Sequence, residues 1–162
     1  MEPFVLEQVV PAPLTQVWRA FSSAEGLKKW MFPVGVAAGT STMDFREGGM
    51  YHYELLPPGG VAFWGRWLFI NIEEPYRIVT HVSFSDAGCG ITRHPMAPDW
   101  PLECRCTYQF SESAEGTMIR LEYAPVGLDP TAFAAFEGGR ASLNQGWGGT
   151  LNNLRRLLAE QP

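Results

Sequence analysis

The strongest hydrophobic pattern lies near the C-terminus, where large apolar residues recur every three or four positions. This spacing predicts an amphipathic helix of about five turns over residues 143–158, with its apolar face packed on a sheet. The stripe consists of Leu143, Trp147, Leu151, Leu154 and Leu158.

Three glycines, Gly146, Gly148 and Gly149, interrupt this stripe. Each costs about 1 kcal/mol relative to alanine in a helix interior, so their presence needs a reason. We expect the backbone to pass close to another surface beside Trp147, where a side chain would not fit. The alternative is a break in the helix.

From about Thr42 to Tyr123, helical spacing gives way to short alternating runs separated by turn signals. Such a pattern is typical of antiparallel strands joined by hairpins. Residues 63–72 are apolar on both faces, so either both faces are covered or a bulge shifts the register. Residues 86–101 form an unusually long connection, and loops of this length are more often functional than incidental.

The segments that flank the strands carry helix signals. An opening strand at residues 4–10 precedes a helical face at residues 14–21. Ser22 and Glu25 have the spacing of a capping box and predict a second short helix. Asp129, which precedes a proline, predicts the start of another helix.

These elements predict an α+β fold with a curved antiparallel sheet of six to seven strands. Two short helices follow the first strand, and the long C-terminal helix encloses a cavity against the sheet. No repeat, linker or change of composition divides the chain, so residues 1–162 are expected to form a single domain.

Four motifs, in this order, resemble proteins named after the activator of the heat-shock protein 90 ATPase. Those proteins belong to the START-like (SRPBCC), Bet v allergen-like superfamily. The motifs are VVPAPLTQVWRAF at 9–21, the D-x-R-x-G-G pattern at 44–49, E-P-x-R-I-V at 74–79, and Gly146-Trp147 with its following leucines.

The resemblance implies a helix-grip fold but no single activity, because a fold does not determine a function. Members of the superfamily include co-chaperone domains, ligand carriers and self-sacrifice resistance proteins. The long connection at residues 86–101 departs from the usual family pattern. It resembles a bacterial subgroup with a similar F-S-D … R-H-P … W-P stretch, which implies no activity.

The composition limits which binding partners and which cellular compartment we expect. The net charge is −5 and no basic run is present, so nucleic acid is not an expected partner. No apolar run approaches the ~20 residues of a membrane span, and the first residues lack the features of a signal peptide. With three cysteines in no disulfide spacing, we expect a cytoplasmic protein. The oligomeric state stays open, with a homodimer among the options.

No catalytic motif is present, and we expect no cofactor. Cys104 and Cys106 resemble half of a metal site, but strand alternation explains them as core residues, so we expect free thiols and no metal. His81 could orient a ligand carbonyl or carboxylate if it faced the cavity. The pattern favours the alternative of a histidine on the outer face. Arg93 and His94 are either a lid or anion contact, or solvated loop charges.

The high aromatic content, 13% of residues, carries the functional hypothesis. We expect a non-catalytic protein that binds a small hydrophobic or amphipathic ligand between sheet and helix. One alternative is a protein-interaction or co-chaperone-like stress-response domain, and another is a cyclase or hydratase that uses a cavity His or Tyr. The candidate ligand-binding residues are Tyr51, Tyr53, Phe63, Trp67, Phe69, His81, Phe84, Cys106, Tyr108, Trp147 and Leu151.

Overall fold

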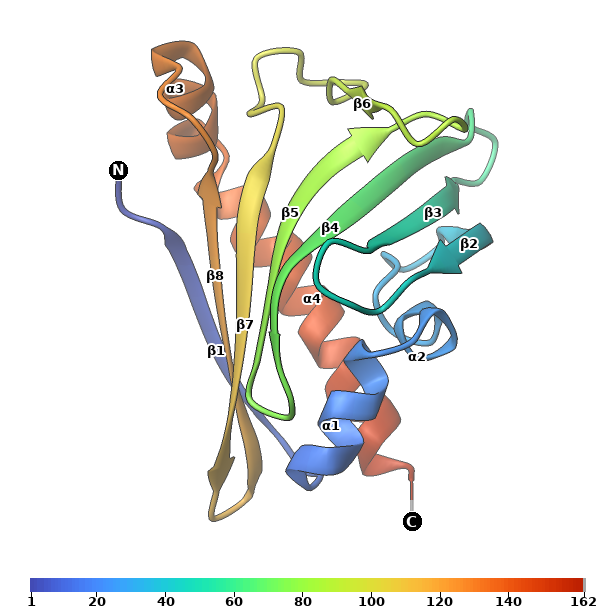
Figure 1. Ribbon diagram of the computed structural model, residues 1–162, viewed down its shortest axis with the longest axis vertical. Helices are drawn as coiled ribbons and strands as arrows, with labels where there is room; N and C mark the ends of the chain where they lie inside the picture. The colour runs from blue at the N-terminus through green and yellow to red at the C-terminus, as the bar shows by residue number, and fades with distance from the viewer. Residues whose placement is uncertain (162) are drawn as a thin grey trace.

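The protein was studied as a computed structural model, which describes residues 1–161. Strands and helices follow one another in the order shown in Figure 1. The elements are β1 (Phe4–Val10), α1 (Leu14–Phe21), α2 (Ala24–Lys28), β2 (Ala37–Met43), β3 (Met50–Leu56), β4 (Phe63–Glu73), β5 (Arg77–Ser85), β6 (Ile91–Thr92), β7 (Cys104–Ser113), β8 (Gly116–Pro125), α3 (Pro130–Gly138) and α4 (Arg140–Ala159).

The strands form one antiparallel sheet in the order β1-β8-β7-β5-β4-β3-β2, and the two-residue β6 pairs with β5. The predicted α+β helix-grip fold is therefore confirmed. The sheet has eight strands within the described residues, one more than expected, because β6 is too short to leave a periodic signal. The run of strands that follows the two short helices begins at Ala37, earlier than the predicted Thr42.

The long helix α4 crosses the inner face of the sheet, which we define as the face directed toward α4 (Figure 1). Leu151, Leu154 and Leu158 are buried, whereas Leu143 and Trp147 are only partly buried. The predicted helix at 143–158 is confirmed. Its C-terminal half packs tightly, and its N-terminal half packs loosely.

The helices α1 and α2 fill the inner face beside the tightly packed half of α4. Phe21 lies 4.7 Å from Trp30 and 5.1 Å from Tyr108, measured between ring centroids. The Trp30 indole donates a hydrogen bond of 3.0 Å to the carbonyl oxygen of Ala20. This aromatic cluster closes one end of the space between helix and sheet.

The structure shows where the bulge of β4 and the N-caps of α2 and α3 lie. The register of β4 shifts between Phe69 and Asn71, so the bulge that the sequence allowed is present. It follows Trp64 and Leu68, which are partly buried on the opposite face from Trp67. The N-cap of α2 is Ser23 and not Ser22, because the extended backbone of Ser23 lets its hydroxyl accept from the Gly26 N–H at 2.9 Å. Asp129 caps α3 as expected, accepting from the Thr131 N–H at 2.9 Å.

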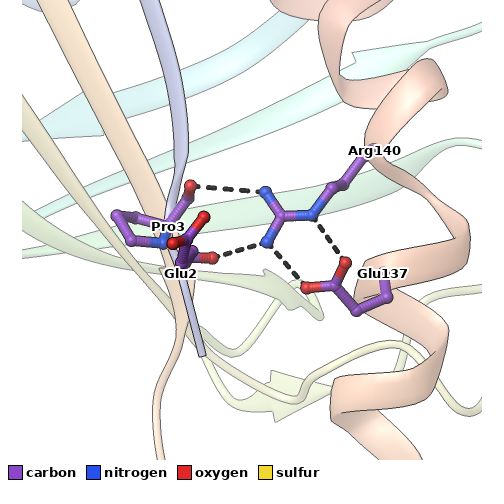
Figure 2. Close-up of polar contacts among 4 residues, drawn as sticks. All are labelled: Glu2, Pro3, Glu137 and Arg140. Atoms are coloured by element: carbon purple, nitrogen blue, oxygen red, sulfur yellow. Dashed lines mark hydrogen bonds and ion pairs between the residues drawn. The ribbon is translucent and has the colours of Figure 1, made fainter.

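The junction between α3 and α4 is tied to the N-terminal segment by Arg140 (Figure 2). Its guanidinium donates to the Glu137 carboxylate at 2.8 and 2.7 Å, and to the carbonyl oxygens of Glu2 and Pro3 at 2.5 and 3.3 Å. These groups lie at the surface, so the contact contributes little to stability, but it fixes where α4 begins.

The explanation that the sequence favoured for the glycines of α4 is wrong. A Cβ atom added at Gly146, Gly148 or Gly149 would have no atom within 4 Å beyond the neighbouring helix turns. The alternative of a broken helix is also wrong, because α4 is continuous from Arg140 to Ala159. The glycines leave space beside the helix and do not relieve a close approach.

Because a side chain at these positions meets open space, replacing glycine should stabilise the helix. We expect Gly149→Ala to raise the free energy of unfolding by up to about 1 kcal/mol, measured by urea denaturation. Gly65→Ala is the control, because a Cβ there would lie 2.4 Å from the Tyr53 ring, and it should destabilise the protein. A loss of stability in Gly149→Ala would contradict the open environment.

Candidate functional site

The loosely packed half of α4 borders a cavity of about 700 Å³, which we call the main cavity. The sheet, the α3–α4 region, the segment after α2 and the long β5–β7 connection all contribute to its wall. From the sheet come Tyr53, Leu55, Trp67 and Val82; from the helices Ala135, Gly138, Gly139, Ser142, Leu143, Gly146, Trp147 and Thr150; and from the loops Met31, Phe32, Pro33, His94, Ala97, Pro98, Asp99 and Trp100.

Trp147 stands between the cavity and the core. Its ring centroid lies 6.0 Å from that of Tyr108 and 6.1 Å from that of Tyr123, both on the inner face of the sheet. Gly146, one residue earlier, also lines the cavity and carries no side chain to fill it. The cavity therefore exists at the place where the helix stripe is interrupted.

The sheet side of the wall is built around Tyr53. Its ring stacks on Tyr51 at 4.7 Å and lies across Gly65 on the neighbouring strand. Burial raises the pKa of Tyr53 to about 12, so its phenol stays protonated at neutral pH. Tyr53 thus offers a hydroxyl that can donate or accept a hydrogen bond.

Two further phenols lie behind this wall. Tyr51 and Tyr108 are fully buried, and within residues 1–161 their hydroxyl oxygens have no hydrogen-bond partner. Burial raises the pKa of both groups. An unpaired buried hydroxyl is destabilising, typically by about 1–3 kcal/mol.

A second, smaller cavity of about 290 Å³ adjoins the first, and we call it the side cavity. The two share Pro33, Tyr53, Leu55, Val82 and Trp100 in their walls. Phe63, Phe84, Cys104 and Tyr123 line the side cavity and not the main cavity. An apolar ligand could extend from one space toward the other.

The long β5–β7 connection contributes to both faces of the sheet. Its first turn lies on the outer face, where the Arg66 side chain donates to the Cys89 carbonyl at 2.7 Å and His52 Nε2 lies 2.8 Å from the Asp86 carbonyl oxygen. The following part, residues 93–100, borders the main cavity, and we call it the mouth segment. The long connection, which was expected to be functional, therefore supplies part of the wall of the main cavity.

Aromatic contacts hold the mouth segment in place. The His94 ring packs on Phe84 at 4.4 Å, and Trp100 packs on Phe136 of α3 at 5.6 Å. The Met96 backbone N–H donates to His94 Nδ1 at 3.0 Å. Burial lowers the pKa of His94, which favours the neutral imidazole.

The predicted site residues fall into groups. Tyr53, Trp67 and Trp147 line the main cavity, and Phe63 and Phe84 line the side cavity. His81 lies on the outer face, because its strand neighbour Val82 lines the cavity from the inner face. The other candidates are buried in the core behind the wall: Tyr51, Phe69, Cys106, Tyr108 and Leu151.

Several wall residues were absent from the predicted set. Leu55 and Val82 follow the same alternation as the predicted Tyr53 and Phe84, so the strand pattern could have identified them. Trp100 and the acidic Asp99 lie on the mouth segment, which has no periodicity. His94 was considered as a lid or anion contact but not as a wall residue.

The cysteines are free thiols in the structure, and Cys104 and Cys106 are buried. Burial raises the pKa of Cys104 to about 12, so this thiol stays protonated at neutral pH. Nowhere in residues 1–161 do three His, Cys, Asp or Glu side chains gather closely enough to hold a metal ion. In the same residues, no helix has the length and apolar character needed to cross a membrane.

Comparisons with known proteins agree with this architecture. The model of the family described as Activator of Hsp90 ATPase homolog 1-like protein matches residues 11–159. A search of the curated proteins gives no match.

Solved bacterial structures share the fold at low sequence identity. A Mycobacterium smegmatis protein is 22% identical, with a TM-score of 0.77 over 98% of this chain and 91% of its own. An Arthrobacter aurescens protein is 18% identical, with a TM-score of 0.81 over 98% and 87%. A Silicibacter pomeroyi protein that carries the family's name is 14% identical, with a TM-score of 0.70 over 97% of each chain.

The unpaired Tyr108 hydroxyl gives a stability prediction. We expect Tyr108→Phe to raise the free energy of unfolding by about 1 kcal/mol, because it removes a buried polar group that has no partner. Tyr76→Phe is the matched control, since Tyr76 is exposed and its change should be close to zero. A clear loss of stability in Tyr108→Phe, measured by urea denaturation, would show that the hydroxyl has a partner.

The lowered pKa of His94 gives a pH prediction. The unfolded chain binds a proton at His94 near the usual pKa of 6.5, whereas the folded chain binds it only at lower pH. The stability that depends on neutral His94 is therefore present above pH 6.5 and is lost as pH falls through the lowered pKa. Between about pH 7.5 and pH 5, unfolding curves should show a larger loss for wild type than for His94→Gln. Equal losses of stability in wild type and in His94→Gln would contradict this prediction.

Proposed function

We propose that this chain, which belongs to the family of Activator of Hsp90 ATPase homolog 1-like proteins, binds a small hydrophobic or amphipathic molecule in the main cavity. The family and fold support a ligand-binding or co-chaperone-type domain. The observation that carries the more specific proposal is the apolar cavity of about 700 Å³ beside α4. Cavities of about 300–1,000 Å³ with few polar groups are typical of small-molecule sites.

The aromatic wall offers enough apolar surface for useful affinity. Removing ~200 Å² of ligand surface from water at about 25 cal/mol/Å² gives ~5 kcal/mol before the costs of association. Trp147, which is only partly buried, contributes apolar surface from the helix, and Trp67, which is 2% exposed, closes the wall from the sheet. This arrangement favours micromolar binding of a flat or chain-like molecule.

Two polar groups of the wall, Tyr53 and His94, do not supply a general base. Tyr53 keeps its proton at neutral pH because burial raises its pKa to about 12. His94 Nδ1 accepts the Met96 N–H, so the neutral ring has no free lone pair with which to remove a proton. The cyclase or hydratase alternative therefore lacks a base among these two residues.

The protein-interaction alternative remains a prediction. Large apolar side chains are exposed at Val34, Val61, Met96 and Leu128, which lie on separate loops. A partner that binds the outer surface would still bind after the cavity is filled. Filling the cavity therefore separates the two hypotheses.

Nile red, a neutral apolar dye, provides a direct test. Wild type should bind it with enhanced fluorescence, and Gly146→Leu should weaken binding at least about tenfold, because the new side chain occupies the cavity. Trp147→Ala should also alter binding, since it removes part of the wall.

Gly149→Leu is the matched control for the cavity-filling variant. It makes the same chemical change three residues further along the same helix, at an exposed position that does not line the cavity. This variant should bind Nile red like wild type. Equal binding by wild type, Gly146→Leu and Trp147→Ala would overturn the proposed function.

A further inference from the structure

Charge is distributed unevenly around the main cavity. Among the residues that the structure describes, Asp99 is the only carboxylate in its wall, and no lysine or arginine lines it. A buried carboxylate on a ligand would therefore meet no cation that could balance it. Such an unpaired charge is expensive to remove from water.

His94 presents a hydrogen-bond donor of fixed position. A backbone amide nitrogen can only donate, so the bond from Met96 N–H requires a lone pair on Nδ1. The proton of the neutral ring must then reside on Nε2. Nε2 has no protein hydrogen-bond partner among residues 1–161, and the residue lines the cavity.

The neighbouring Arg93 does not supply the missing cation. Its guanidinium donates to the Pro98 carbonyl oxygen at 3.0 Å. It lines a separate surface depression together with Phe84 and Asp86, and it does not line the main cavity. The mouth segment thus offers the ligand one neutral donor and one carboxylate.

We propose that the ligand of the main cavity carries an uncharged hydrogen-bond acceptor, such as an amide, ester or ketone carbonyl, which binds His94 Nε2–H. This inference rests on the proposed function and specifies the chemistry of its ligand. The apolar body of the ligand lies against Trp67 and Trp147, and its carbonyl end lies at the mouth segment. Asp99 disfavours ligands that end in a carboxylate.

Three ten-carbon probes of equal chain length test this chemistry through displacement of Nile red at neutral pH. Decanamide presents a neutral carbonyl, decanoate presents an anion, and decylamine presents a cation without an acceptor. We expect decanamide to bind at least about tenfold more tightly than decanoate. Asp99→Asn should narrow this difference by improving the binding of decanoate.

Two variants of His94 separate ligand recognition from the structural role of the ring. The Asn side chain places a carbonyl near the position of Nδ1, so His94→Asn keeps the acceptor for Met96 N–H but lacks the donor at Nε2. The Gln side chain reaches the position of Nε2 with an N–H group. We expect His94→Asn to weaken decanamide about fivefold, His94→Gln to retain most of the affinity, and decylamine to change little in either.

The outcomes distinguish this inference from the proposed function. If Nile red and the probes fail to bind wild type at all, the proposed function fails and the inference fails with it. If the probes bind but decanoate equals decanamide, or His94→Asn weakens all three equally, only the inference is overturned. Preference for decanamide that His94→Asn abolishes and His94→Gln preserves would support it.

Discussion

A straight helix can follow a bent sheet along only part of its length, and this mismatch between α4 and the sheet governs the structure. Leu151, Leu154 and Leu158 fill the gap where helix and sheet lie close together. Towards its N-terminus the helix stands away from the sheet, with Trp147 only partly buried and Gly146 without a side chain. Interiors are normally close-packed, so a gap that the sequence leaves unfilled is the basis for the proposed ligand site.

Close packing holds the sheet side of the open space in place. Tyr53 can lie flat across the sheet only because Gly65 on the next strand has no Cβ. Stacking on Tyr51, together with the edge contact between Tyr51 and Trp67, fixes the phenol in that position. On the helix side, Arg140 anchors the start of α4 to the N-terminal segment. The packing around Tyr53 opposes collapse of the sheet side into the cavity.

Periodicity predicted the parts of this arrangement that repeat. The leucine stripe identified α4 and its buried face, and strand alternation favoured the outer face for His81. Alternation could not orient Trp67, because residues 63–72 are apolar on both faces. The same signals could not show why α4 contains glycines, since a close approach and an empty space call for the same residue. Because Ser22 and Ser23 are adjacent, the sequence predicted the N-cap of α2 one residue too early. His94 lies in a loop without a period, so only the structure could place it in the wall.

The regular elements and the mouth segment contribute different properties to the proposed site. The sheet and α4 provide size and apolar character, which follow from the fold. His94 and Asp99, two of the polar groups in the wall, both come from the mouth segment. Packing of His94 on Phe84 and of Trp100 on Phe136 fixes these groups against the scaffold without making them part of it. Relatives with the same sheet and helix but a different connection would therefore keep an apolar cavity and select different ligands.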